Sequence, residues 1–227
     1  MTPLRRLAGR ILARIRPPAD HRAVFGGIFR RNEWGDAESV SGPGSTRARG
    51  ADFTAELVAL LRGLETRTLL DAPCGDFNWI AEAADAVERY VGVDVVPELV
   101  ERNRRRHPAG GRSFVLADIS RDALPAADVV LCRDCLVHFS DRDVWATLAN
   151  FRRSGSRYLL TTTFVARGAN ADIRTGSWRP LDLQAAPFRF PPPLERVDER
   201  CTHTGGIFRD KRLGLWELAS LPSRRGG

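Results

Sequence analysis

Three acidic residues stand at the ends of three apolar segments in the first half of the chain. The segments are 68–72, 90–93 and 113–117, and the acids are Asp71, Asp94 and Asp118. If the segments are strands of one parallel sheet, their carboxyl ends meet at one edge, where open α/β sheets bind ligands. Asp94 lies 23 residues beyond Asp71, a spacing that suits a carboxylate accepting hydrogen bonds from both hydroxyls of a ribose. Asp118 can accept from an exocyclic amine, and Ile119 can pack on a ring.

The turn after the first segment differs from that of a dinucleotide-binding protein. A pyrophosphate site needs Gly-x-Gly-x-x-Gly so that the backbone can approach the phosphates. Here Pro73 and Phe77 occupy two of those glycine positions, whereas Gly75 still permits a close backbone approach. With the three acids, this turn predicts a pocket for a phosphate-free adenosine compound that is cationic at its reactive centre. S-adenosylmethionine has that chemistry.

Alternating strands and helices must position these residues. Strands are predicted at 68–72, 90–93, 113–117, 128–132 and 158–162, with helices at 77–87, 97–106 and 141–151. This alternation predicts right-handed βαβ units and therefore an α/β fold with a doubly wound, mostly parallel sheet. Two further strands, near 196–201 and 213–218, bring the sheet to seven strands. A helix is expected at 53–64, before the first strand.

Residues 67–163 resemble the core of the class I S-adenosylmethionine-dependent methyltransferases, which have a Rossmann-like fold. Residues 71–75 resemble their first motif, 91–94 the second and 117–118 the third. The stretches 38–45, 71–79 and 132–138 also resemble a bacterial subgroup of these enzymes. The resemblance implies that Asp71 and Gly75 line the methionine part of the cofactor. The residues expected at the cofactor are Asp71, Pro73, Gly75, Asp76, Asp94, Val95, Asp118, Ile119, Cys132 and Arg133.

The end of the fourth predicted strand faces the methyl group in this fold and carries the candidate catalytic residues. Asp134 and His138 are four residues apart, so a helical turn would place both on one face. His138 is the candidate general base, Asp134 would orient it or bind the acceptor, and Arg133 would hold an acidic or hydroxylated group. The alternative is structural, with Arg133 paired to Asp134 and His138 packed beside Phe139.

The cysteines argue against a metal site, and together with a missing motif they argue against nucleic-acid methylation. Cys132 and Cys135 form a single Cys-x-x-Cys pair without a second pair, so no metal site is expected. Cys132 also lacks the preceding proline that is usual for cytosine-C5 methyltransferases. No Asn-Pro-Pro-Tyr-like motif of the base amino-methyltransferases is present. Four cysteines at this length favour a reducing, cytoplasmic setting.

Two irregular segments are candidates for covering the site. The Gly-, Ser- and Pro-rich stretch 34–46 is interpreted as an active-site lid, with Trp34 and Ser41 as its candidate contacts; a plain linker is the alternative. The segment 164–194, rich in proline and aromatic residues, is expected to form one wall of the acceptor pocket, or else an ordered surface connection. In this segment Trp178 and Arg179 would stack on a sugar or an aromatic acceptor.

The net charge of +7 is located at the two ends of the chain. Residues 1–19 hold five arginines and no acid, and Arg224 and Arg225 add two charges, which leaves residues 20–223 balanced. A short basic amphipathic helix is expected at 4–16, either in weak contact with a membrane surface or packed on the domain. The chain therefore divides into the basic segment 1–18, the lid and helix at 19–66, and the methyltransferase domain at 67–220.

These observations predict an S-adenosylmethionine-dependent O-methyltransferase that acts on a small molecule or a glycan. Two alternatives stay open: a protein or RNA methyltransferase, and a regulatory protein that binds the cofactor without turnover. A closed pocket would favour a small acceptor, and a long basic groove would favour a polymer. Fold class alone does not choose among them.

Overall fold

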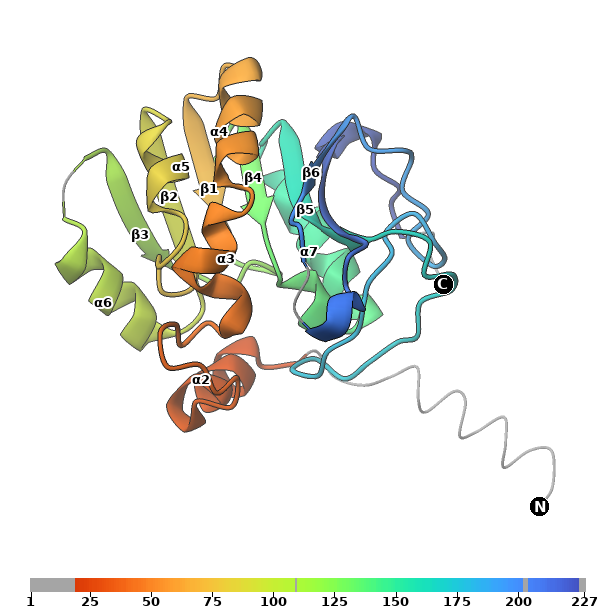
Figure 1. Ribbon diagram of the computed structural model, residues 1–227, viewed down its shortest axis with the longest axis horizontal. Helices are drawn as coiled ribbons and strands as arrows, with labels where there is room; N and C mark the ends of the chain where they lie inside the picture. The colour runs from red at the N-terminus through yellow and green to blue at the C-terminus, as the bar shows by residue number, and fades with distance from the viewer. Residues whose placement is uncertain (1–18, 109, 202–203, 225–227) are drawn as a thin grey trace.

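Seven strands form one mixed sheet in the order β3-β2-β1-β4-β5-β7-β6 (Figure 1). The computed structural model describes residues 19–108, 110–201 and 204–224, so the helix expected at 4–16 lies outside them. The strands are β1 (Thr68–Asp71), β2 (Arg89–Asp94), β3 (Arg112–Leu116), β4 (Val129–Cys132), β5 (Tyr158–Phe164), β6 (Glu195–Asp198) and β7 (Lys211–Glu217). Strands β1 to β5 pair in parallel, and β7 runs antiparallel to both β5 and β6. The predicted α/β class and mostly parallel seven-stranded sheet are confirmed.

Helices cover both faces of the sheet. Neighbouring residues of each strand point to opposite faces, and on both faces these residues are apolar. On one face Leu69 packs with Leu57 of α4, and on the other Leu70 packs with Leu148 of α7. The helices are α2 (His21–Arg31), α3 (Arg47–Ala51), α4 (Thr54–Gly63), α5 (Ala81–Asp85), α6 (Pro97–Arg106) and α7 (Asp141–Arg153). Strands β4 and β5 are buried along their whole length. This explains why they read as continuous apolar runs rather than as alternating ones.

Local sequence determines several element boundaries. Pro97 begins α6 at its first turn, and the Ser140 hydroxyl caps α7 by accepting a hydrogen bond from the Asp143 amide at 3.2 Å. Helix α5, however, begins at Ala81, four residues later than the helix predicted at 77–87. The reason is Phe77, whose φ of +56° is left-handed and cannot be part of a helix.

The turn after β4 also differs from the prediction. A single 3-10 turn, η2, begins only at Leu136 and ends at His138, and Asp134 has a left-handed φ of +52°. Asp134 and His138 therefore do not share a helical face, although both remain beside the end of β4. The segment between Phe164 and Glu195 contains no helix or strand among its residues, all of which the structure describes.

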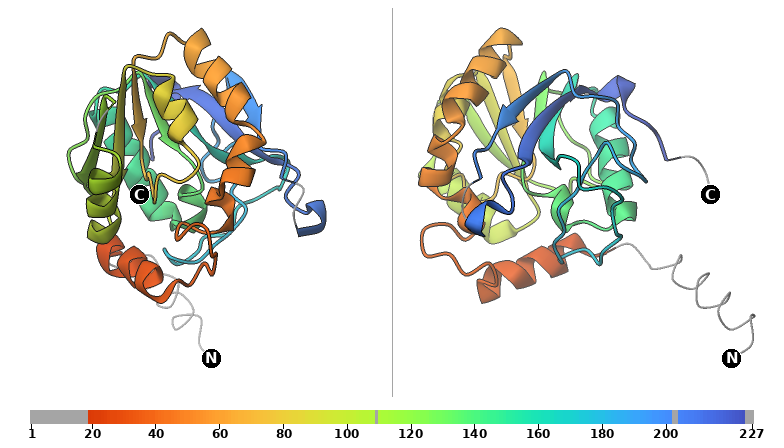
Figure 2. Two further views of the ribbon diagram at one scale, coloured as in Figure 1. Left: turned by 60° about the vertical axis from the view of Figure 1, so that its left-hand side comes forward. Right: turned by 45° about the vertical axis from the view of Figure 1, so that its right-hand side comes forward.

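The sheet topology determines where a ligand site can form. The strand order reverses between β1 and β4, so the loops after these strands diverge and leave a crevice at their carboxyl ends. Helix α2 crosses beneath this end of the sheet, and η1 (Pro43–Ser45) and α3 follow it (Figure 2). Within the described residues, no helix is both long and apolar enough to cross a membrane.

Candidate active site

A cavity of about 600 Å³ opens at the carboxyl end of the sheet. Most of the residues predicted for the site line it together: Trp34, Ser41, Asp71, Pro73, Gly75, Asp76, Asp94, Val95, Asp118, Ile119, Arg133, Asp134, His138 and Trp178. They come from the loops after β1, β2, β3 and β4, from the stretch 34–46 and from the segment after β5. The convergence of these loops is the expected geometry of a ligand site in an open α/β sheet.

Asp94 is held by backbone amides of two different loops. Its Oδ2 accepts a hydrogen bond from the Gly75 amide at 3.0 Å, and its Oδ1 accepts one from the Val96 amide at 2.9 Å. The glycine is required here because its φ is +52°, a conformation that residues with a side chain rarely adopt. The carboxylate that was predicted to hold a ribose therefore also positions the turn after β1.

Burial raises the pKa of both acids in the innermost part of the cavity. The pKa of Asp71 is raised to about 7 by burial, against the hydrogen bond that Tyr90 Oη donates to its Oδ2 at 2.5 Å. Burial also raises the pKa of Asp94 to about 6, against its backbone hydrogen bonds. The charge of Asp94 adds to the shift at Asp71. A cation bound beside these two carboxylates would relieve the cost of burying them.

Asp118 is bound by a histidine that the sequence analysis did not identify. His21, at the start of α2, is 2% exposed and places Nδ1 3.0 Å from Asp118 Oδ1 and Nε2 3.3 Å from Asp143 Oδ2. Burial alone would lower the pKa of His21, but the two carboxylates outweigh it and raise that pKa to about 9. An imidazolium thus fixes α2 over the cavity, where its Phe25 and Phe29 contribute to the lining.

The stretch 34–46 contacts the turn after β1 directly. The Ser39 hydroxyl donates to the Asp76 carboxylate at 2.9 Å, and the Val40 amide donates to it at 3.1 Å. The Ser41 hydroxyl in turn accepts from the Asp76 amide at 3.0 Å. A Cβ at Gly75 would stand 2.3 Å from Ser41 Oγ, so the close packing of this stretch on the turn depends on the glycine.

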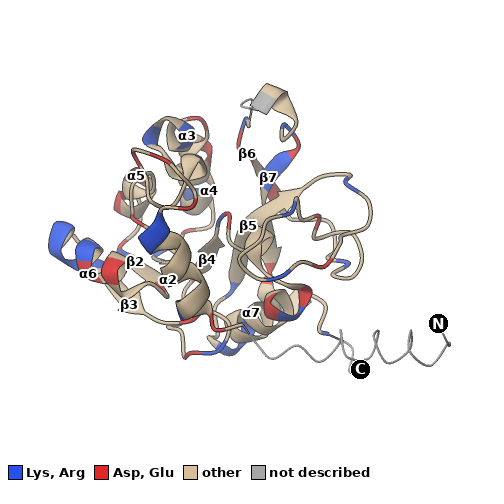
Figure 3. Cartoon of the chain, turned by 90° about the horizontal axis from the view of Figure 1, so that it is seen from below, with Lys and Arg blue, Asp and Glu red and all other residues tan. Residues whose placement is uncertain are grey.

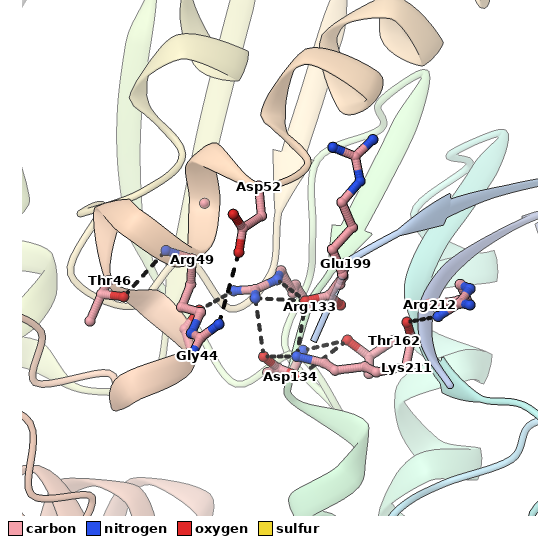
Figure 4. A network of polar contacts seen from close by, with 12 residues as sticks. Gly44, Thr46, Arg49, Asp52, Arg133, Asp134, Thr162, Glu199, Lys211 and Arg212 are labelled. Carbon is pink, nitrogen blue, oxygen red and sulfur yellow. Dashed lines mark hydrogen bonds and ion pairs between the residues drawn. The ribbon is translucent and has the colours of Figure 1, made fainter. Parts of the chain in front are cut away.

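Asp134 belongs to a network of four charged side chains at the other end of the cavity, and the remaining three, Arg133, Glu199 and Lys211, are buried (Figure 4). Lys211 Nζ lies 2.6 Å from Asp134 Oδ2 and 2.9 Å from Glu199 Oε2. Arg133 donates two hydrogen bonds to Glu199 Oε2, at 3.0 and 2.7 Å, and a third to the Gly44 carbonyl at 2.8 Å. Burial would raise the pKa of Asp134, but Lys211 and Arg133 lower it well below its usual value. Asp134 therefore stays ionised and is a weak proton acceptor.

His138 has the features of an available base. Its Nδ1 lies 2.9 Å from the Ser177 carbonyl, which can only accept, so Nδ1 carries the proton and Nε2 keeps its lone pair. Burial lowers the pKa of His138, which keeps the ring neutral at neutral pH. The ring packs against Trp34, with centroids 5.1 Å apart. Its nitrogen lone pair and its contact with the lid both suit a group that acts on a bound acceptor.

Two predicted residues lie away from the cavity. Cys132, in β4, is fully buried in the core, and only its neighbour in the pair, Cys135, reaches the lining. Arg179 is 5% exposed and donates to the Phe139 carbonyl and to Asp141, both at 2.8 Å. Its position beside Trp178 suggested a shared role, but consecutive residues of the segment point in different directions.

Several cavity residues had no recognisable sequence signal. His21, Arg49 and Glu199 come from parts of the chain distant from the motifs, and none has a diagnostic spacing. Lys211 did carry a signal, because it is the single lysine of an arginine-rich chain. A lone lysine at the start of a strand, among so many arginines, indicates that a compact ammonium group is needed there.

A comparison with protein families agrees with this geometry. Residues 69–155 match the model of the family described as methyltransferase domain. No curated protein matches the chain in sequence. Among solved structures, the N-methyltransferase NodS from Bradyrhizobium japonicum WM9 is 17% identical, with a TM-score of 0.49 over 73% of this chain and 96% of that one. Magnesium protoporphyrin IX methyltransferase (ChlM) from Synechocystis PCC 6803, solved with bound SAH, is 18% identical, with a TM-score of 0.47 over 64% of this chain and 69% of that one.

A third solved structure is the methyltransferase domain of bacterial CtHen1-CN, which is 17% identical. Its TM-score is 0.44 over 48% of this chain, and the matched part spans 64% of that chain.

The matched segment runs from β1 into the end of α7 and so includes the loops that carry Asp71, Asp94, Asp118 and Asp134. This segment matches a methyltransferase domain, and with the strand order and the row of acids it points to S-adenosyl-L-methionine as the cofactor. The residues present fit this cofactor. Asp71 and Asp94 are buried carboxylates with raised pKa values and no ion pair to any described residue, and the cofactor is a cation.

The raised pKa values of Asp71 and Asp94 predict how cofactor affinity depends on pH. A sulfonium favours the ionised carboxylates, so the Kd of S-adenosylmethionine should rise as the pH falls through 7 and 6. We expect a rise of roughly tenfold between about pH 8 and pH 5.5, measured by calorimetry. S-adenosylhomocysteine, whose thioether is uncharged, should show a clearly smaller rise. Equal pH dependence of the two ligands would contradict a role for these acids in holding the sulfonium.

The contact of His21 predicts a pH-dependent contribution to stability. Because its folded-state pKa is raised from 6.5 to about 9, that contribution is fully present below pH 6.5 and is lost as the pH rises through 9. We expect His21→Gln to lower the free energy of unfolding by about 3 kcal/mol at about pH 6 and by much less at about pH 10. Urea unfolding at the two pH values measures this difference.

The matched control is Arg22→Gln, which removes an exposed charge from the next position of α2. It should leave stability almost unchanged at both pH values. A loss from His21→Gln that is equal at the two pH values would show that the ring acts by packing alone.

Proposed function

We propose that the chain is an S-adenosylmethionine-dependent O-methyltransferase of a small hydroxylated acceptor, either a small molecule or a glycan. The observation that carries the proposal is the state of His138: a neutral ring with Nδ1 protonated and a lone pair on Nε2, in a cavity that is also lined by Asp71, Asp94 and Asp118. A hydroxyl acceptor must lose its proton as it is methylated, and an imidazole lone pair is suited to receive it.

His138 and Asp134 would have separate roles in methyl transfer. When bound, the cofactor supplies an electrophilic methyl group on a sulfonium. His138 Nε2 would take the hydroxyl proton as the acceptor oxygen attacks that methyl group in line. Asp134, held ionised by Lys211 and Arg133, would accept a hydrogen bond from the acceptor and fix its orientation rather than act as the base.

The acceptor end also offers an apolar wall. Trp178 is 43% exposed and packs against Phe208, with ring centroids 5.1 Å apart, and Phe164 packs against both rings. All three rings line the cavity. Such a wall can stack on the face of a sugar or of an aromatic ring, while the polar groups at the end of β4 bind its hydroxyls.

The dimensions and charge of the site favour a small acceptor over a polymer. A volume of about 600 Å³ is typical of a small-molecule pocket, and α2 and the lid cover it. Seen from the end of the sheet, acidic and basic residues are interspersed, apart from the arginines 104–106 at the end of α6 (Figure 3). This distribution supports neither an RNA groove nor a long acidic-peptide groove.

A kinetic experiment on His138 tests the proposed chemistry. The enzyme is first assayed with S-adenosylmethionine labelled in the methyl group against fractions of a cell extract, which identifies a fraction that accepts the label. With that fraction, His138→Gln should lower kcat by roughly a hundredfold or more, because it removes the base. The Kd of S-adenosylmethionine should stay within about twofold.

His107→Gln is the control, because His107 is a half-buried histidine that does not line the cavity. It should leave kcat unchanged. An unchanged kcat in His138→Gln would rule out His138 as the base. Cofactor binding without transfer to any fraction would favour a regulatory protein that binds the cofactor without turnover.

A further inference from the structure

The charged network at the end of β4 leaves two hydrogen-bonding groups unused by the described residues. Arg133 and Lys211 both contact Glu199 through one oxygen, Oε2, at 2.7 and 2.9 Å. The other oxygen, Oε1, is buried and has no hydrogen-bond partner in the described part of the chain. Lys211 Nζ has three N–H groups, and among the described residues it contacts two, Asp134 and Glu199. One hydrogen-bond acceptor and one hydrogen-bond donor therefore remain on adjacent side chains.

Glu199 Oε1 requires a donor from outside this network. The Glu199 side chain is 2% exposed and lines the cavity. A buried oxygen that accepts no hydrogen bond destabilises the folded state, because it has lost its contact with water and gained no other donor. The Arg133 guanidinium is held elsewhere, since Nη1 donates to the Gly44 carbonyl at 2.8 Å and Cζ lies 4.7 Å from the centroid of the Trp79 ring. A molecule bound in the cavity is therefore the expected donor.

The charges of the network favour a neutral ligand group. Two cations, Arg133 and Lys211, contact two acids, Asp134 and Glu199, so the network is balanced without a further ion. A hydroxyl is neutral and can both donate and accept, so one hydroxyl can donate to Glu199 Oε1 and accept from Lys211 Nζ. The two unused groups of the network thus match a hydroxyl.

The sheet positions Lys211 beside the aromatic wall of the acceptor end. Lys211 begins β7 and is in register with Phe164, the last residue of β5. Its amide donates to the Phe208 carbonyl at 3.0 Å, and Phe164 and Phe208 both pack against Trp178. A ring that stacks on this wall would thus have its hydroxyls close to the ammonium group.

We propose that Glu199 and Lys211 bind a second hydroxyl of the acceptor, next to the hydroxyl that is methylated. The inference rests on the proposed function, in which Asp134 orients the methylated hydroxyl. Asp134 and Glu199 contact the same Lys211 nitrogen, at 2.6 and 2.9 Å, and converge on it in Figure 4. Hydroxyls bound at the two carboxylates must therefore be close together, as they are on neighbouring carbons. The acceptor class is a vicinal diol, for which a sugar and a catechol are the two sources.

Oxidation of the acceptor tests the diol before the acceptor is identified. Periodate cleaves the bond between neighbouring carbons that both carry a hydroxyl, and it also oxidises a catechol. The extract fraction that accepts the methyl label is treated with sodium periodate, the excess is consumed with ethylene glycol, and methyl transfer by the unsubstituted protein is measured. Periodate should abolish transfer to this fraction. The control is the same fraction mixed with periodate that ethylene glycol has already consumed.

Ferricyanide separates the two sources of the diol, because it oxidises a catechol and leaves a sugar diol intact. Loss of transfer after periodate alone would identify a sugar-like diol. Loss of transfer after either oxidant would identify a catechol.

Glu199→Gln tests whether this residue binds the second hydroxyl. The variant keeps the size of the side chain, but an uncharged amide binds a hydroxyl more weakly than a carboxylate does. Measured over dilutions of the accepting fraction, the apparent KM should rise by roughly tenfold, while kcat stays within about threefold and the Kd of S-adenosylmethionine within about twofold. Glu195→Gln, at an exposed position of β6, is the matched control and should change none of the three.

A periodate-treated fraction that accepts as much label as its control, or an unchanged apparent KM in Glu199→Gln, would overturn the inference and leave the proposed function intact. If Glu199→Gln does not fold, oxidation of the acceptor still decides the question with the unsubstituted protein. If no fraction accepts the label, the proposed function fails and the inference fails with it.

Discussion

The burial of carboxylates at one end of a parallel sheet is the constraint on which the rest of this structure depends. Asp71 and Asp94 are the last residues of β1 and β2, and Asp118 lies just after β3; their desolvation is costly unless hydrogen bonds or a cation compensate it. Each acid receives different hydrogen bonds. Tyr90 donates to Asp71, two backbone amides donate to Asp94, and His21 contacts Asp118. What remains unbalanced at the first two acids is negative charge, which a cationic cofactor would neutralise.

The same acids organise the N-terminal part of the chain. Helix α2 is fixed through His21 on Asp118, and the stretch 34–46 through Ser39 and Ser41 on Asp76. The segments that cover the cavity are therefore bound to the loops that form its floor. At the opposite end, Arg133 contacts the Gly44 carbonyl of the stretch 34–46 and Glu199, which directly follows β6. A displacement of the loops at the ends of the strands would therefore be transmitted through these hydrogen bonds to α2 and to the stretch 34–46.

Local patterns predicted the sheet well, because its strands are short, buried and regularly interrupted by helices. The acids at the strand ends could be placed at one edge from sequence alone, since a parallel topology brings those ends together. The start of α5 could not be predicted, because the left-handed φ of Phe77 has no marker in residue type. The relation of Asp134 to His138 was misjudged for the same reason.

Contacts between residues that lie far apart in the sequence could not be predicted either. His21 meets Asp118 across 97 positions, and Lys211 meets Asp134 across 77. Such pairs follow from how the elements pack, and a single sequence contains no periodicity that reveals them. Arg179 shows the converse error, because its neighbour Trp178 reaches the cavity while Arg179 itself is directed to Asp141.

Calorimetric titration of S-adenosylmethionine into the protein and into Asp94→Ala tests the central claim most directly. Asp94 joins the turn after β1 to the place where the ribose is expected, so we expect one-to-one binding to the unsubstituted protein. Asp94→Ala should weaken that binding by roughly a hundredfold, while the variant stays folded. Failure of the unsubstituted protein to bind, or equal affinity of the two proteins, would contradict that claim.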